Sequence, residues 1–402
     1  MKSNSLDINQ GNMIPYINMS LISRRSDESL KDFERSFNAR VMDIFADNRL
    51  TTVEELKKDT EDFLKSVKME FIWGESGKTK YVTLTRLTKI LKKSPKSIRD
   101  LLPHKTVSTF VKITNFNLTI DITLLEELVN TVVYAEELYI KLLPFSENST
   151  EISNYSLQDF VASHYVPKMI EEPERSDYYS AYAVGIIFFL LDTRKREYIF
   201  LKDLLSSTLL MQLEACINAE NNCLPMPEID VFTVAQFRST LHEFRLLDTD
   251  RNGVLSRTEL TDFREGNFNG MFLQRVFDIS MTYENGCLDF KAFVDLVTAI
   301  RFRHTQASAK YHFEALDLKH DGILDEEEIR TAVCFQAQVI PEYVSDDTNV
   351  NIDIVTAELK DMLHLKKSGL TSEDFVADRM NPTFSGFLSN YADYIKYERR
   401  EQ

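Results

Sequence analysis

Cysteine and glycine are scarce in this sequence, and each shortage excludes a class of protein. The four cysteines, Cys216, Cys223, Cys287 and Cys334, stand far apart and without CxxC spacing. They therefore indicate neither a disulfide framework nor a zinc site, and we expect reduced, mostly buried thiols. None of the 11 glycines belongs to a phosphate-binding loop. The stretch 74–79 has Ile72 where that motif requires its first glycine, so we interpret it as a polar turn.

Basic charge and long apolar runs are also lacking. Lys and Arg number 47 against 63 Asp and Glu, which gives a net charge of −16, and no basic run is long enough to bind nucleic acid. The longest apolar run, residues 181–191, is too short to span a bilayer, and the polar residues 1–10 do not resemble a secretory signal. We therefore expect a cytoplasmic or nuclear protein that contacts neither nucleic acid nor membrane.

The sequence also lacks catalytic motifs. His242 and Glu243 begin the helical pattern of zinc proteases, but Leu246 stands where the second histidine belongs. The other histidines have no cysteine or acidic partner at the spacing of a metal site or a triad, and no serine lies in a nucleophile elbow. The sequence therefore predicts a protein that is not an enzyme.

What the sequence does have is one complete calcium-binding loop, at residues 248–259. Every ligand position of a twelve-residue loop is filled, by Asp248, Asp250, Asn252, the Val254 carbonyl, Ser256 through a water, and Glu259 as a bidentate carboxylate. Gly253 stands at the sharp turn, and Leu255 at the position where two such loops pair through a β-bridge. Apolar residues at three- and four-residue spacing predict a helix on each side. The sequence therefore predicts a Ca²⁺ site in a helix–loop–helix unit, the EF-hand.

A second acidic loop, at residues 317–328, has one defect. Its remaining ligand positions hold Asp317, Asp321, the Ile323 carbonyl, Asp325 and Glu328. Lys319 stands at the third position, where it removes an oxygen ligand and adds a positive charge. This substitution weakens Ca²⁺ binding unless the side chain swings outward and water takes its place, so both outcomes stay open.

Degenerate copies of the unit occur upstream, as expected for proteins built from repeated hands. Residues 148–159 have the right length, with Tyr155 at the β-bridge position, but they lack early carboxylates. Residues 192–203 begin and end with Asp, but Arg194 and Arg196 occupy ligand positions and exclude Ca²⁺ as the loop stands.

Two further copies supply pairing partners for the acidic loops. The residues around Leu288 resemble a hand whose closing position is an alanine, and we interpret them as the metal-free partner of the first loop. A degenerate loop ending near Asp374 is the expected partner of the second loop, with a bridge between Leu370 and Leu324.

The apolar periodicity predicts a mostly α protein composed of helix–loop–helix units. Outside the loops it predicts helices at 27–46, 53–69, 87–92 and 123–141, and a terminal helix after Pro382 that packs on the last hand. The stripe at 30–45 is either core or a docking face for a partner. We divide the chain into a mobile tail (1–25), an N-terminal helical region (26–175), a first EF-hand region (176–300) and a second EF-hand region with a C-terminal helix (301–402).

Several pieces of sequence, in their order, resemble the B-double-prime regulatory subunits of protein phosphatase 2A. They are residues 188–192, 247–250, 272–277, 282–283 with 288–290 and Phe293, and 313–317. The resemblance covers about residues 176–376 and depends on the order of the pieces, because single calcium loops occur in many families. The chain is most similar to the shorter branch of the family, which is associated with centrosomes and microtubule organisation, and to a nematode-type spindle-assembly subunit.

The resemblance implies an elongated, mostly helical and non-catalytic regulatory subunit. Such a subunit docks on the HEAT-repeat scaffold subunit and places substrates near the separate catalytic subunit, at a location such as the centrosome and spindle where another protein recruits it. Asp248, Asp250, Asn252 and Glu259 match the family's calcium loop, whereas Lys319 departs from a full site.

Two alternatives belong to other classes of protein. A free-standing EF-hand sensor would bind an amphipathic target helix and expose apolar surface with Ca²⁺. A calcium-gated hydrolase would need a nucleophile or metal motif that the sequence does not offer. The loops that lack calcium ligands outnumber the one complete loop. This ratio suits a rigid scaffold better than a calcium-dependent switch.

Overall fold

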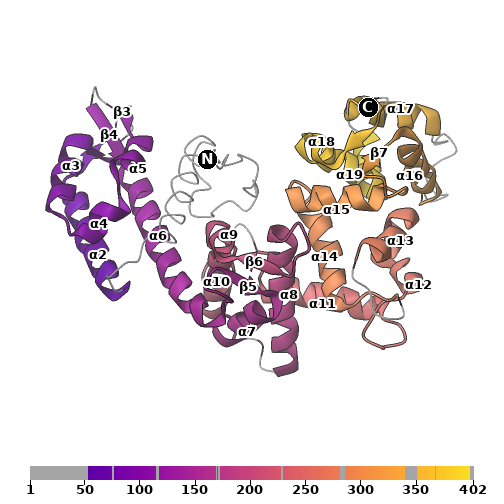
Figure 1. The fold of residues 1–402 in the computed structure, drawn as a ribbon, viewed down its shortest axis with the longest axis horizontal. Coiled ribbons are helices and arrows are strands. Elements are labelled where there is room, and N and C mark those ends of the chain that lie inside the picture. Colours follow the sequence, from indigo (N-terminus) through magenta and orange to yellow (C-terminus); the bar gives the residue numbers. More distant parts are fainter. Residues whose placement is uncertain are drawn as a thin grey trace, which may run out of the picture. The chain divides into compact units, whose positions relative to one another are not determined.

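The computed structural model describes residues 53–398, apart from short stretches at 75–76, 115–116, 169, 171–172, 228–229, 281–285, 340–350 and 367. The predicted tail at 1–25 and helix at 27–46 lie outside the described residues. The described chain is mostly helical, as predicted (Figure 1). It forms two compact units, one from the described parts of Asn18–Phe160 and Ile199–Gln212, the other from those of Val161–Tyr198 and Leu213–Gln402. We refer to them as the N-terminal and C-terminal units.

The N-terminal unit is built from helices around a small sheet. Its helices are α2 (Val53–Met69), α3 (Leu84–Lys93), α4 (Lys96–Leu101), α5 (His104–Thr109), α6 (Ile122–Leu142), η1 (Leu143–Phe145) and α9 (Leu201–Ser206). Its strands are β1 (Ile72–Trp73), β2 (Lys80–Thr83), β3 (Lys112–Thr114), β4 (Asn117–Asp121) and β5 (Glu151–Ser153). Helix α7 (Asn154–His164), strand β6 (Tyr198–Phe200) and helix α10 (Leu209–Asn221) cross the boundary between the units.

Local sequence explains where the main helices of this unit begin. Helix α2 has Glu54 and Glu55 in its first turn, where acidic side chains interact favourably with the positive end of the helix dipole. Helix α6 begins after Asp121, whose carboxylate accepts the N–H groups of Thr123 and Leu124. The helices predicted at 53–69 and 123–141 are therefore confirmed.

The sheet of the N-terminal unit was not predicted. Strands β1, β2, β4 and β3 pair in this order, and Val82 lies opposite Ile120 with both side chains buried. These strands have two to five residues, which is too short for alternation of apolar and polar residues to stand out. Two local pairings, β1 with β2 and β3 with β4, are joined into one sheet by the pairing of β2 with the more distant β4.

The C-terminal unit contains both acidic loops. Its helices are α8 (Pro173–Leu191), α11 (Val234–Leu247), α12 (Arg257–Leu260), η2 (Phe263–Gly266), α13 (Gly270–Ile279), α14 (Phe290–Arg301), α15 (Gln306–Leu316), α16 (Glu326–Val339), α17 (Ile352–Met362), α18 (Ser372–Ala377), α19 (Asn381–Ser389) and α20 (Tyr391–Glu398). Two short strands, β7 (Ile323–Leu324) and β8 (Leu370–Thr371), pair with each other. The acidic loops lie between α11 and α12 and between α15 and α16.

The end of the chain packs into the core around the second loop. Phe384, Phe387 and Tyr394, from α19 and α20, lie in one buried cluster with Leu324 and Phe375. Burial of aromatic side chains of this size is a major contribution to stability. The prediction that the terminal segment packs on the last hand is therefore confirmed.

Two other sequence expectations need correction. Tyr155 is not at a β-bridge: it lies in α7 and is 75% exposed, whereas β5 three residues earlier pairs with β6 and buries Ile152. The error is one of register, because the loop has no acidic residue to mark its start. All four cysteines are free, but of these only Cys216 is buried and Cys223 is exposed.

Among the described residues, no helix combines the length and apolar character needed to cross a bilayer.

Gly369 gives a test of the packing beneath β7. Its φ is +77°, and an added β-carbon would overlap the Ile323 side chain and lie 2.9 Å from the Leu324 carbonyl oxygen. Gly266 has a similar φ of +73° but open space around it. We expect Gly369→Ala to lower the free energy of unfolding by about 2 to 4 kcal/mol, through strain and overpacking, and Gly266→Ala by about 1 kcal/mol through strain alone. Denaturant titration of both variants measures the difference, and equal losses would contradict this account.

Candidate calcium site

The first loop, residues 248–259, begins where α11 ends. Helix α11 is capped by Thr233, whose hydroxyl accepts the Gln236 N–H, and it buries Phe237 and Phe244 on one face. Its last turn closes with the Asp248 N–H donating to the Phe244 carbonyl. Anchoring of this helix in the core therefore fixes the position of the first predicted ligand.

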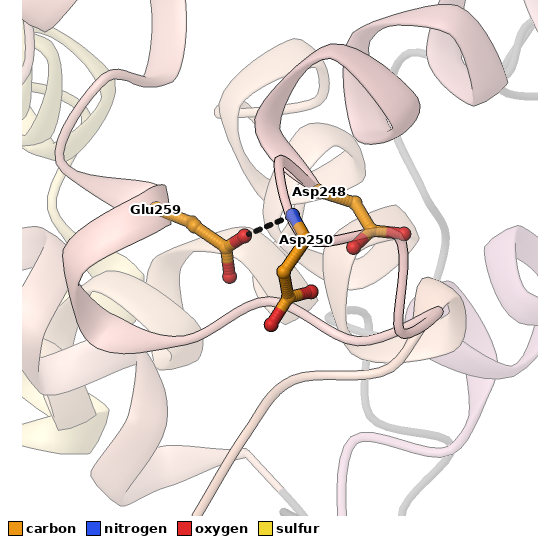
Figure 2. Close-up of side chains that lie close together, drawn as sticks. All are labelled: Asp248, Asp250 and Glu259. Atoms are coloured by element: carbon orange, nitrogen blue, oxygen red, sulfur yellow. Dashed lines mark hydrogen bonds between the residues drawn. The ribbon is translucent and has the colours of Figure 1, made fainter.

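Three carboxylates of the loop lie close together, and Glu259 faces the backbone nitrogen of Asp250 (Figure 2). One oxygen each of Asp248, Asp250 and Glu259 lie within 4.8 Å of one another, and in the described part of the chain no other such group of three is present. Calcium–oxygen distances are about 2.3 to 2.6 Å, so ligands on opposite sides of one ion stand about 5 Å apart. The spacing of these oxygens is therefore compatible with a shared Ca²⁺.

Backbone N–H groups hold the Asp248 carboxylate in place. Its two oxygens accept from Asn252 N at 3.0 Å and from Gly253 N at 3.0 Å. The turn that aims these donors needs a φ of +82° at Gly253, which is a left-handed conformation that glycine adopts without strain. Asp248 is only 8% exposed, so it is the most protected of the three ligands.

Glu259 ties the end of the loop to its beginning. Oε1 accepts the Thr249 N–H and hydroxyl, both at 2.8 Å, and Oε2 accepts the Ser256 N–H at 2.9 Å and hydroxyl at 2.8 Å. Burial acts to raise the pKa of Glu259, but the hydrogen bonds from Ser256 and Thr249 outweigh it and lower the pKa to about 2. The carboxylate is therefore ionised and preoriented at neutral pH.

The other predicted ligands lie in the same loop with hydrogen bonds of their own. Asn252 Oδ1 accepts the Val254 N–H at 2.9 Å, and its amide nitrogen donates to Asp250 Oδ2 at 2.9 Å. Ser256 forms a capping box with Glu259 at the start of α12. The Ser256 hydroxyl donates to the carboxylate that closes the site, and its role in holding a water stays a prediction.

Each acidic loop pairs with a degenerate loop as predicted. Leu255 and Leu288 form an isolated antiparallel bridge, with N–H to carbonyl distances of 2.7 and 2.8 Å. Leu324 lies opposite Leu370 in the β7–β8 pair. These bridges confirm that the residues around Leu288 and Leu370 belong to partner hands.

The second loop, residues 317–328, has the same frame as the first. Asp317 accepts from Asp321 N at 3.3 Å and Gly322 N at 2.9 Å. Glu328 accepts from Lys319 N at 3.0 Å and Asp325 N at 3.0 Å, and it is 1% exposed. The loop is therefore folded as an EF-hand loop although its third ligand is missing.

The Lys319 ammonium group supplies a positive charge to this second loop. Nζ lies 2.5 Å from Asp325 Oδ2 and 2.8 Å from Glu327 Oε2. Hydrogen bonds to these two carboxylates raise the pKa of Lys319, and the Lys319 ammonium lowers the pKa of Asp325. The predicted ligand Asp325 is thus paired with a side chain of the protein.

Sequence analysis missed several residues that support the site. Thr249 donates twice to Glu259, although it occupies no ligand position. Arg257, in the first loop, binds Asp278 of α13, which also binds the buried Arg275. The signal for Arg275 was its charge within the otherwise uncharged stretch 271–277, but no pattern could name its partners.

Removal of the closing carboxylate tests the site. We expect Glu259→Gln to weaken Ca²⁺ binding by about tenfold or more, because one negative charge and one ligand oxygen are lost. The gain in stability from Ca²⁺ should fall by about 1.4 kcal/mol for each factor of ten in affinity. Titration calorimetry and thermal unfolding with and without Ca²⁺ measure both effects. Glu265→Gln, at an exposed position outside the loop, is the matched control, and equal behaviour of the two variants would argue against the site.

Three family models match successive parts of the chain. They are described as the RSA-1 N-terminal domain (residues 30–136), the RSA-1 middle domain (147–233) and the RSA-1 C-terminal domain (248–402). The last of these includes both acidic loops and their partner hands.

Whole-sequence relatives agree with these models. The chain is 65% identical to serine/threonine-protein phosphatase 2A regulatory subunit rsa-1 of Caenorhabditis elegans, over 97% of each chain. It is 28% identical to the B'' subunit gamma of Danio rerio over 56% of this chain and 48% of that protein. One chain of a PP2A PR70 holoenzyme structure matches with a TM-score of 0.52 and 18% identity, over 65% of this chain and 98% of that one, which supports the fold alone.

The resemblance to B-double-prime subunits is thereby confirmed, and the non-catalytic role it implied follows from the family. The chain belongs to the RSA-1 family and is a regulatory, not a catalytic, subunit of protein phosphatase 2A.

Proposed function

We propose that this chain is a calcium-binding regulatory subunit that docks on the scaffold and catalytic subunits of protein phosphatase 2A. The proposal of Ca²⁺ binding rests on the Asp248, Asp250 and Glu259 carboxylates, which lie close together in one loop. Backbone N–H groups of this loop already hold Asp248 and Glu259 in place. Asn252 and the Val254 carbonyl would complete the ligand set. A bound Ca²⁺ would neutralise the carboxylates and fix the angle between α11 and α12, and the chemistry of the phosphatase would remain on the catalytic subunit.

The role of Ca²⁺ in this proposal is structural. In two loops that depart from the full ligand pattern, a basic side chain of the protein pairs with an acidic side chain of the loop. Lys319 pairs with Asp325 in the second loop, and Arg196 pairs with the buried Asp192 in the loop at 192–203. A body whose loops are held largely by internal charges keeps its shape without the ion, so we propose that it binds the phosphatase constitutively.

We further propose that the subunit directs the enzyme to the centrosome and spindle through a recruiting protein. The sequence resemblance to the branch of B-double-prime subunits associated with microtubule organisation supports this location. The four-part division of the chain at residues 25, 175 and 300 stays a prediction from apolar periodicity and the positions of the loops.

Assembly of the purified proteins tests the regulatory role. We expect the full chain to co-elute with the phosphatase scaffold and catalytic subunits on size exclusion, both with Ca²⁺ and with chelator, because the internal ion pairs persist in either condition. Co-elution only with Ca²⁺ would make the first loop an assembly switch. Absence of co-elution in both would contradict the proposed docking and favour a free-standing sensor.

The second loop gives a separate prediction. We expect the wild-type chain to bind one Ca²⁺ tightly, at the first loop, and the second loop to bind more weakly because Lys319 removes a ligand and repels the ion. Lys319→Asp restores the oxygen and removes the ammonium, so titration calorimetry should then count two tight sites.

Lys360→Asp is the matched control for this experiment. It makes the same change in charge and breaks the ion pair between Lys360 and Glu326 of α16, but it leaves the loop ligands in place. It should leave the count at one, and two tight sites in the wild-type chain would contradict the role given to Lys319.

A further inference from the structure

We propose that Arg257, Asp278 and Arg275 form a relay that couples Ca²⁺ binding at the first loop to the conformation of the second loop. The proposal rests on the proposed binding of Ca²⁺ at the first loop and adds a route by which the second loop, with its own internal cation, senses that binding. The relay lies entirely within the C-terminal unit.

The relay begins inside the first loop. Arg257 is the first residue of α12 and stands two positions before Glu259, in the same helical turn. Its guanidinium donates to the Gln274 carbonyl at 2.9 Å and to Asp278 Oδ1 at 2.8 Å, and it stacks over the Phe277 ring at 4.8 Å. A movement of α12 when Glu259 closes on an ion would therefore act directly on α13.

Asp278 joins the two arginines. Its second oxygen, Oδ2, accepts from Arg275 NH1 at 2.8 Å. The hydrogen bond from Arg257, followed by that from Arg275, lowers the pKa of Asp278 despite its partial burial. Exposed ion pairs contribute little singly, but here two guanidinium groups share one carboxylate, and the Arg275 residue is only 7% exposed.

Arg275 carries the contact to the second loop. The last carbonyl groups of a helix have no hydrogen-bond donor within the helix. At the end of α15, Arg275 NH2 supplies this donor and binds Glu314 O and Asp317 O, each at 3.0 Å. Its NH1 also lies 3.1 Å from His320 Nε2. Asp317 is the first residue of the second loop and His320 the fourth, so the guanidinium holds the entry to that loop.

The bridge between Leu255 and Leu288 joins the first loop to its own partner hand. The relay is a continuous chain of charge-assisted hydrogen bonds from the tenth residue of one loop to the first residue of the other. Coupling between two sites requires a shared structural element whose conformation both sites influence. Here that element is α13, which contains Arg275 and Asp278.

Hydrogen exchange of the full chain, read by mass spectrometry with Ca²⁺ and with chelator, tests the relay. In the wild-type chain Ca²⁺ should slow exchange of amides in 248–259 and also in 317–328, where Lys319, Gly322 and Asp325 donate to loop carboxylates. We expect slowing by about fivefold or more at the second loop, the range of ordinary allosteric coupling.

Asp278→Asn should keep the response of the first loop and abolish that of the second. Asp353→Asn, which removes the exposed ion pair of Asp353 with Arg330 of α16, is the matched control and should respond like the wild-type chain. Arg257→Gln should match Asp278→Asn, and the double variant should add nothing further, because both break the same chain of contacts.

The outcomes are distinguishable. If Ca²⁺ leaves 248–259 unchanged in the wild-type chain, the proposed calcium site fails and the relay with it. If the first loop responds and the second does not, the relay alone is overturned. If the second loop still responds in Asp278→Asn, either the coupling runs elsewhere or Ca²⁺ binds the second loop directly, and the relay is again overturned.

Discussion

One carboxylate in each acidic loop joins the two ends of that loop, and the arrangement of both hands depends on it. Glu259 accepts N–H groups from Thr249 near the start of the first loop and from Ser256 at the cap of α12. Glu328 repeats the pattern with Lys319 and Asp325. Because the same side chain is bound to the entering segment and to the exiting helix, it links the two flanking helices before any ion binds. A metal ion would add charge neutralisation to a frame that hydrogen bonds already define.

The same frame is completed by different cations in different parts of the chain. The first loop leaves three carboxylates converging without a basic partner among them, which fits Ca²⁺. In the second loop Lys319 pairs with Asp325 and Glu327, and in the loop at 192–203 Arg196 pairs with Asp192. An internal cation balances the negative charge of its loop without a bound ion, because its positive charge is tethered and does not dissociate. The loops therefore differ in the source of the positive charge and share the same backbone frame.

Sequence periodicity and loop spacing were sufficient for the larger features. Helix α2 was predicted with its observed bounds, and the bridges of Leu255 with Leu288 and of Leu324 with Leu370 followed from the eighth position of an EF-hand loop. The sheet of β1 to β4 was not predicted, because its short strands carry no usable alternation and its central pairing joins β2 to β4 across α3, α4 and α5. Tyr155 was placed three residues out of register, because a loop without carboxylates has no fixed starting point.

The sequence alone determined the ligands of the first loop, the defect at Lys319 and the resemblance to phosphatase regulatory subunits, because each is a pattern of residue types at fixed spacing within one short segment. Tertiary structure decided what those residues contact. Whether Lys319 points at water or at Asp325 and Glu327 depends on how α16 leaves the loop, and the contact of Arg275 with Asp317 depends on how α13 packs beside α15. These contacts join residues 6, 8 and 42 positions apart, and the course of the backbone and the packing of helices bring them together without leaving any local pattern in the sequence.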